Sequence, residues 1–252
     1  MKNKIFLPRS IFSRIFLSEI DSTELEFQFV PAALTAKHIL ENSNSLGLIP
    51  SLDLLTNKDL FVSPKIGISF DALLSNAYIH FKEDQATINE LFLKGDISSN
   101  EVILSKILFK EFYDVNIKTT LITSEPEDFK SNLLIAGDEN YEKELILNGL
   151  SFSEEVIELI SAPYVNFVLV SSSENALKEF EKTFRPKLVK GHSEKYKTLF
   201  PELPDTSLDF LSVNIQHLVF DFDEQDIEGI KQLLQLPYFH GLIKEMIDVK
   251  FV

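Results

Sequence analysis

The stretch TINELFLKGDISSNEVILSKILFKEFY, from Thr87 to Tyr113, decides the fold because it predicts a strand, a polar loop and a helix in succession. The strand is the largely apolar run Ile88 to Leu93, and turn residues follow it. Ser98 followed by Glu101 is a capping-box pattern, and an apolar stripe at helical spacing comes next. Its simplest interpretation is an ordinary capped helix. A helix that begins directly after a strand also presents unpaired N–H groups, and open α/β sheets bind ligands at such turns.

The composition predicts a globular protein with a phenylalanine-rich core. The chain has 252 residues, enough for one large domain or two small ones. Its hydrophobic content is 44% and its mean hydropathy is +0.04, so a substantial core can form. The chain contains 22 phenylalanines and no tryptophan, so phenylalanine must supply most of the aromatic packing.

Charge and motifs exclude several classes of function. The 39 acidic residues outnumber the 24 basic ones, which gives a net charge of −15 and argues against nucleic acid or an anionic membrane as partner. The absence of cysteine excludes disulfides, thiol catalysis and cysteine-ligated metals. The five histidines form no metal-binding pattern, and no GxSxG, GxGxxG or P-loop is present. We therefore expect no metal and no cofactor, and we expect neither a hydrolase nor a nucleotide-binding protein.

The first twenty residues have some features of a signal peptide. Lys2 and Lys4 precede an apolar run, but Pro8, Arg9 and Arg14 interrupt it and no small-residue cleavage site follows. No apolar run reaches the length of a membrane span. We therefore expect a cytoplasmic protein.

The order of the remaining elements predicts an α/β protein, because strands and helices alternate from the start of the chain. Further strands are expected at residues 4–7, 24–30, 46–49, 61–69, 77–81, 117–123, 133–136, 163–170 and 217–222. Further helices are expected at residues 10–16, 31–41, 125–130, 154–160, 174–184, 204–213, 223–236 and 238–249. Residues 185–204 carry three prolines and are expected to be mostly loop, with at most one short helix.

Several short segments, in this order, resemble a known family. They are LGLIPS (46–51), SP (63–64), IGIS (66–69), ILSKILFKEFY (103–113), LLIAGDENY (133–141), SAPYVNFVLV (161–170) and FLSVNIQHLVFDFDEQDIEGIKQLL (210–234). Together they are similar to the menaquinone-biosynthesis family of the futalosine pathway, in particular its chorismate dehydratase-like members. Each segment alone is weak, and their order and spacing over most of the chain carry the resemblance.

The resemblance implies a two-lobed type II periplasmic-binding-protein fold with a central ligand cleft. Residues 1–82 and 173–252 would form a discontinuous first lobe, and residues 83–172 the second. The implied reaction is the loss of water from chorismate to give 3-enolpyruvylbenzoate, which would make the protein a carbon–oxygen lyase. The alternative is a non-catalytic solute-binding protein of the same fold with a different small-molecule ligand. The oligomeric state is left open.

The chain departs from the family pattern at functional positions. The family has an asparagine in the cleft after its first strand, and Arg9 or Ser10 stands in that place here. The family's Ser-Arg-Thr-Ser loop is here Ser98 to Glu101, so a carboxylate replaces a hydroxyl. That carboxylate would sit at the positive end of a helix, and we expect it to weaken the binding of a substrate carboxylate.

A substrate-binding site is therefore expected at strand ends and helix starts, with no catalytic residue assigned. Its members are Arg9, Ser10, Ser69, Ser98, Ser99, Asn100, Glu101, Gly137 and Asp138. Each also has a purely structural interpretation: Ser98 as a helix cap, Glu101 as its capping partner, and Gly137 with Asp138 as a turn. Arg9 would be either a surface residue or the counter-charge of a carboxylate ligand.

Overall fold

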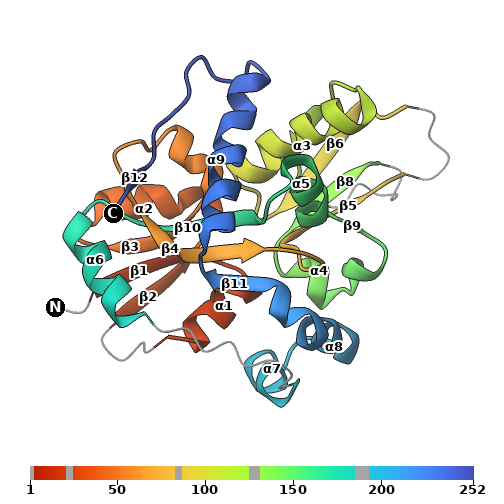
Figure 1. The fold of residues 1–252 in the computed structure, drawn as a ribbon. Coiled ribbons are helices and arrows are strands. Elements are labelled where there is room, and N and C mark those ends of the chain that lie inside the picture. Colours follow the sequence, from red (N-terminus) through yellow and green to blue (C-terminus); the bar gives the residue numbers. More distant parts are fainter. Residues whose placement is uncertain (1–2, 21–24, 83–86, 125–130, 185–192) are drawn as a thin grey trace.

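The computed structural model describes residues 3–20, 25–82, 87–124, 131–184 and 193–252, and these form two α/β lobes (Figure 1). Each lobe is built on its own β-sheet with helices packed against it, and the sheets share no strand. This architecture confirms the expected α/β class with two lobes.

The first sheet contains seven strands within the described residues. Their order is β11-β4-β10-β3-β1-β2, and β12 pairs with the beginning of β4. The strands are β1 (Asn3–Pro8), β2 (Leu25–Val30), β3 (Leu46–Pro50), β4 (Phe61–Phe70), β10 (Tyr164–Ser171), β11 (Leu218–Asp221) and β12 (Lys250–Phe251). The helices of this lobe are α1 (Ile11–Ser18), η1 (Ala32–Leu34), α2 (Thr35–Glu41), η2 (Ser51–Leu55), α6 (Glu174–Thr183), α7 (Ser193–Leu199), α8 (Asp205–Asn214), η4 (Ile215–His217) and α9 (Glu224–Phe239).

The second sheet has the order β7-β6-β8-β5-β9. Its strands are β5 (Ala77–His80), β6 (Glu90–Gly95), β7 (Lys118–Leu121), β8 (Leu133–Ala136) and β9 (Leu150–Ser151). The helices are α3 (Ser99–Tyr113), α4 (Glu139–Glu142), η3 (Leu145–Leu147) and α5 (Phe152–Ile160). The chain enters this lobe between β4 and β5 and returns between α5 and β10. The division expected from the sequence places β5 in the first lobe and β10 in the second. In the structure, β5 pairs in the second sheet and β10 in the first.

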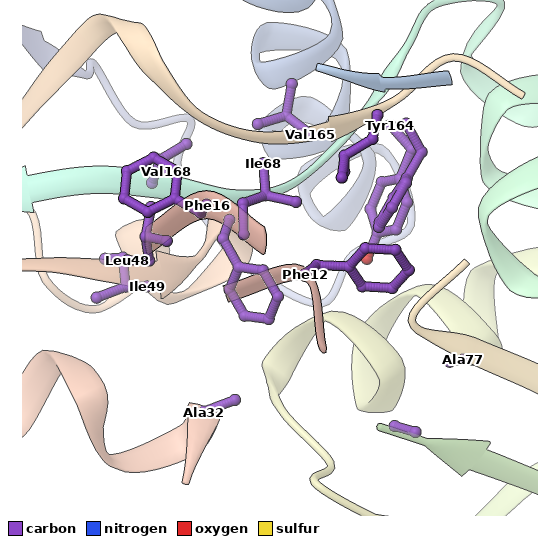
Figure 2. Packing of buried hydrophobic residues seen from close by; sticks show 14 of the residues in the cluster. Phe12, Phe16, Ala32, Leu48, Ile49, Ile68, Ala77, Tyr164, Val165 and Val168 are labelled. Atoms are coloured by element: carbon purple, nitrogen blue, oxygen red, sulfur yellow. The ribbon is translucent and has the colours of Figure 1, made fainter. Parts of the chain in front are cut away.

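Aromatic side chains fill the space where the two lobes meet. Phe12 of α1 is fully buried, and its ring lies 4.9 Å from that of Phe70 and 5.8 Å from that of Tyr141 in α4. Figure 2 shows Phe12 among the buried side chains of this cluster. The phenylalanine-rich composition thus supplies a continuous core across the junction of the lobes, and not one core in each.

Three expectations differ from the structure or fall outside it. The helix expected at 238–249 is wrong: α9 continues through Pro237 to Phe239, Gly241 then takes a φ of +67°, and the chain runs in turns to β12. Strand β2 lies at the edge of its sheet, so Phe27 stays 48% exposed although its alternating pattern predicts burial. The helix expected at 125–130 lies outside the described residues.

Gly229 permits the close packing of α9 on β10. A Cβ atom at this position would lie 2.3 Å from the carbonyl oxygen of Pro163. In an exposed helix a glycine-to-alanine change stabilises by up to about 1 kcal/mol. We expect Gly229→Ala to do the opposite here and to lower the free energy of unfolding by about 1–3 kcal/mol, because the backbone must shift. Urea unfolding of this variant beside Lys231→Ala, on an exposed position of the same helix, measures the effect, and a Gly229→Ala protein as stable as wild type would contradict it.

Candidate functional site

The start of α1 is held by a carboxylate from the opposite lobe. Ser10 is the N-cap, and its hydroxyl accepts a hydrogen bond from the Phe12 N–H at 3.1 Å. The Ile11 N–H donates to Asp138 Oδ1 at 2.7 Å, across the gap between the lobes. Asp138 stands directly after the turn at Gly137, where β8 ends and α4 begins. The positive end of an α1 helix dipole is thus already paired with a negative group of the protein itself.

A second carboxylate makes an equivalent contact nearby. The Ala32 N–H, at the start of η1, donates to Asp96 at 2.9 Å and 3.2 Å from its two oxygens. Asp96 lies in the polar loop between β6 and α3. Burial raises the pKa of the Asp96 carboxyl, while the Ala32 N–H and the charge of Arg9 act to lower it. Two acidic side chains of the second lobe therefore bind backbone donors of the first.

Arg14 adds an ion pair to this junction. Its guanidinium lies 3.5 Å from Asp138 Oδ2 and 2.6 Å from Glu202 Oε1, and it stacks over the Phe200 ring at 4.4 Å. Burial is the main influence on Asp138 and raises the pKa of its carboxyl to about 6, against the opposing effects of the Ile11 N–H and Arg14. Asp138 is therefore mostly ionised at neutral pH, but it titrates far closer to neutrality than an exposed aspartate does.

A small cavity remains between the lobes at this point. Its volume is about 130 Å3, and it is lined by Arg9, Ser10, Arg14, Phe29 and Asp138. Sites for drug-sized ligands span about 300–1,000 Å3, so this space accepts one small polar group and little more. Two arginines, one aspartate, one serine and one phenylalanine line it, and almost all of the surface that they present to the cavity is apolar.

The loop at the start of α3 forms the predicted capping box. Ser98 Oγ donates to Glu101 Oε2 at 2.6 Å, and the Ser98 N–H donates to the same oxygen at 2.8 Å. Glu101 is only 1% exposed, and this burial raises the pKa of its carboxyl, although the two bonds from Ser98 act to lower it. Glu101 does not line the small cavity, and the capping box that the sequence predicts for Ser98 and Glu101 is confirmed.

The buried side chain of Asn100 connects the two lobes by hydrogen bonds. Its Oδ1 accepts the Leu52 N–H at 3.0 Å, and its Nδ2 donates to the Asn166 carbonyl at 2.8 Å and to Asn166 Oδ1 at 3.0 Å. Leu52 belongs to η2 and Asn166 to β10, so the amide ties the start of α3 to two elements of the first lobe. This fully buried side chain is engaged on both ends and does not line the small cavity.

The structure thus brings together part of the expected site. Arg9, Ser10 and Asp138 line one cavity, with Gly137 adjacent in a left-handed turn at φ +100°. Ser69 is buried in β4, where it lowers the pKa of Asp226 at the start of α9. Ser99 has a buried hydroxyl with no hydrogen-bond partner among the described residues.

Sequence reasoning missed Arg14, Phe29 and Asp96. Arg14 follows Ser10 by four residues, so helical spacing places it above the start of α1 and could have revealed it. Asp96 lies in the stretch that decides the fold, but only the tertiary structure places it opposite Ala32. Within the described residues, no cluster of three histidine or acidic side chains could hold a metal ion. None of the helices in the described parts of the chain is long and apolar enough to cross a bilayer.

Comparisons with known proteins identify the fold alone. No protein-family model and no curated protein matches the sequence. The periplasmic aliphatic sulphonate binding protein SsuA from Escherichia coli superposes with a TM-score of 0.62 and 15% identity, over 98% of this chain and 90% of that one.

Two further solved structures agree with this result. Protein AF1704 from Archaeoglobus fulgidus gives a TM-score of 0.57 at 11% identity, over 95% of this chain and 98% of its own. The alkanesulfonate-binding protein SsuA from Xanthomonas axonopodis pv. citri, bound to MOPS, gives 0.58 at 13% identity, over 99% of this chain and 97% of its own. The chain therefore has the two-lobed fold of periplasmic solute-binding proteins.

The raised pKa of Asp138 has a consequence for stability. The pKa of Asp138 is about 6 in the folded protein and 3.8 in the unfolded chain, so the protonated carboxyl favours the folded state. Its ionisation therefore lowers the free energy of unfolding as the pH rises from about 4 to about 6. We expect Asp138→Asn to gain stability relative to wild type over this pH range, by no more than about 3 kcal/mol because the side chain is partly solvated. Urea unfolding at pH 4 and pH 7 measures the difference. Asp209→Asn, an exposed position, is the control, and a difference that does not change with pH would contradict the expectation.

Proposed function

We propose that this chain is a small-molecule-binding protein whose cleft takes one organic anion, a carboxylate or a sulfonate, without converting it. One observation carries the proposal: the Asp138 carboxylate accepts the Ile11 N–H at the start of α1 across the cleft. A carboxylate tethered in this way occupies the position that the anionic group of a ligand would take. The ligand is therefore expected to exchange with Asp138 and to change how the lobes contact each other.

The chemistry around the start of α1 suits a single anion. A helix N-terminus stabilises a negative group through its free N–H groups and its dipole. Ser10, Arg9 and Arg14 line the same small cavity, and arginine pairs well with planar or tetrahedral anions. Two of the similar structures are sulphonate-binding proteins, which supports a sulfonate beside a carboxylate as the head group.

A second anionic group of the same ligand would find no free partner among these donors. Asp96 already accepts the Ala32 N–H, and Glu101 already accepts the Ser98 N–H. Two like charges about 4 Å apart repel by about 4 kcal/mol at an effective dielectric constant of about 20. A monoanion thus fits the cleft better than a dianion such as chorismate, and this favours the non-catalytic alternative over the dehydratase.

Chorismate dehydratase activity is the second candidate, and the ordered sequence resemblance to that family favours it. The reaction requires a cleft that holds both carboxylates of the substrate and excludes water. For this the Asp96 contact to Ala32 would have to open together with the Asp138 contact to Ile11. The proposal of a non-catalytic binder and the dehydratase hypothesis therefore differ in which ligand binds tightly and in whether a product forms.

Calorimetric titration with butanesulfonate, butyrate and chorismate tests the proposed function. We expect the two monoanions to bind and chorismate to bind at least tenfold more weakly. Asp138→Ala removes the competing carboxylate and should tighten monoanion binding about tenfold or more, because a charge-assisted hydrogen bond is worth about 1.5–3 kcal/mol. Arg14→Gln should weaken it by a comparable factor.

Asp209→Ala removes one exposed carboxylate of the first lobe and serves as the matched control for net charge. Chromatographic detection of 3-enolpyruvylbenzoate after incubation with chorismate provides the second readout. Formation of this product by the wild-type protein would replace the proposal by the dehydratase function. Monoanion affinities that do not respond to Asp138→Ala would show that the ligand binds elsewhere.

A further inference from the structure

A second and larger groove lies on the first lobe, between α2 and η2. Its volume is about 450 Å3, and it shares no lining residue with the small cavity between the lobes. One wall carries Ala33, Ala36 and Leu40 at helical spacing, with Lys37 and Glu41 beside them. The other wall carries Asp53, Thr56 and Asn57 from the end of η2.

Hydrogen bonds within the turn after η2 hold the polar wall of the groove. Asn57 Nδ2 donates to the Asp53 carbonyl at 2.8 Å and to Thr56 Oγ1 at 3.2 Å, and Thr56 Oγ1 donates to the same carbonyl at 3.2 Å. These bonds hold the turn after η2. Two of the three engage the backbone oxygen of Asp53, the third joins Asn57 to Thr56, and none of them reaches the Asp53 carboxylate.

The Asp53 carboxylate has no counter-ion in the described parts of the chain. Lys37, the cation in the groove lining, lies 3.8 Å from Glu41 and pairs with it. Burial raises the pKa of the Asp53 carboxyl to about 6, so it is still mostly ionised at neutral pH. A largely buried carboxylate without a paired cation is unfavourable, and a bound cation would remove that cost.

A hydroxyl group from the second lobe stands beside this carboxylate. Ser99 acts to lower the pKa of Asp53, but its buried Oγ makes no hydrogen bond of ordinary geometry to any described residue. Ser99 does not line the groove, so a ligand in the groove meets the Asp53 carboxylate and not this buried hydroxyl.

We propose that this groove binds a small organic ammonium ion, with its charged end on Asp53 and its alkyl part along Ala33, Ala36 and Leu40. The net charge of −15 favours such a ligand, because the field of the whole protein concentrates cations near its surface. This site is separate from the anion site at α1, so either can be present without the other.

Calorimetric titration with hexylammonium, 1-hexanol and hexanoate tests the proposal, because the three probes differ chiefly in charge. We expect hexylammonium to bind at least tenfold more tightly than hexanol, and Asp53→Asn to weaken hexylammonium about tenfold to a hundredfold. Asp59→Asn removes an exposed carboxylate nearby and should leave the affinity unchanged. Asp138→Ala should also leave it unchanged, although that variant alters the binding of anions.

Ala33→Leu provides a second test that keeps every charge. Ala33 is exposed on the groove wall, so a leucine fills the space without disturbing the core, and it should weaken hexylammonium about tenfold. This variant tests the proposed ammonium site if Asp53→Asn does not fold. Equal affinity for hexylammonium and hexanol would overturn the proposal, as would no measurable binding of hexylammonium by the wild-type protein. Full retention of hexylammonium binding in both Asp53→Asn and Ala33→Leu would also overturn it.

Discussion

The hydrogen bond from the Ile11 N–H to the Asp138 carboxylate is the contact on which the arrangement of the two lobes depends. It joins the start of a helix in one lobe to the turn that begins a helix in the other. Its energy comes from a charged acceptor meeting a helix dipole in a partly buried setting. The same contact has a cost, since burial makes the ionised form of Asp138 less favourable. The contact thus joins the two lobes while carrying an energetic cost of its own.

Other contacts limit how the lobes can move. Asn100 ties α3 to η2 and β10, and the Ser75 backbone carbonyl accepts the Tyr141 hydroxyl at 2.9 Å near the crossing between the sheets. Both groups are buried, so breaking either would leave polar atoms unpaired in the core. The contacts of Asp96 and Asp138 lie nearer the surface and cost less to open. This difference favours separation at the cleft over separation at the crossing strands.

The distribution of charge distinguishes the two sites of the first lobe. At the start of α1, Arg9 and Arg14 lie beside the carboxylates of Asp138, Glu202 and Asp96. Between α2 and η2, the single lysine of the lining is paired with Glu41, and no cation of the described residues pairs with Asp53. The proposed anion site therefore has arginines beside its carboxylates, whereas the proposed cation site has a carboxylate without one.

The sequence by itself determined the α/β class, most strand positions and the capping box of Ser98 and Glu101, because hydrophobic periodicity and capping are local properties. It also predicted Ser10 and Asp138 as members of a ligand site, and the structure places both at the small cavity between the lobes. It misplaced the end of α9, since a proline there did not stop the helix. Only the tertiary structure decided that Asp138 meets Ile11, that Asp96 meets Ala32, and that Asp53 has no counter-ion among the described residues. These pairings join residues far apart in the chain, and no local pattern records which donor a carboxylate will face once the lobes have packed.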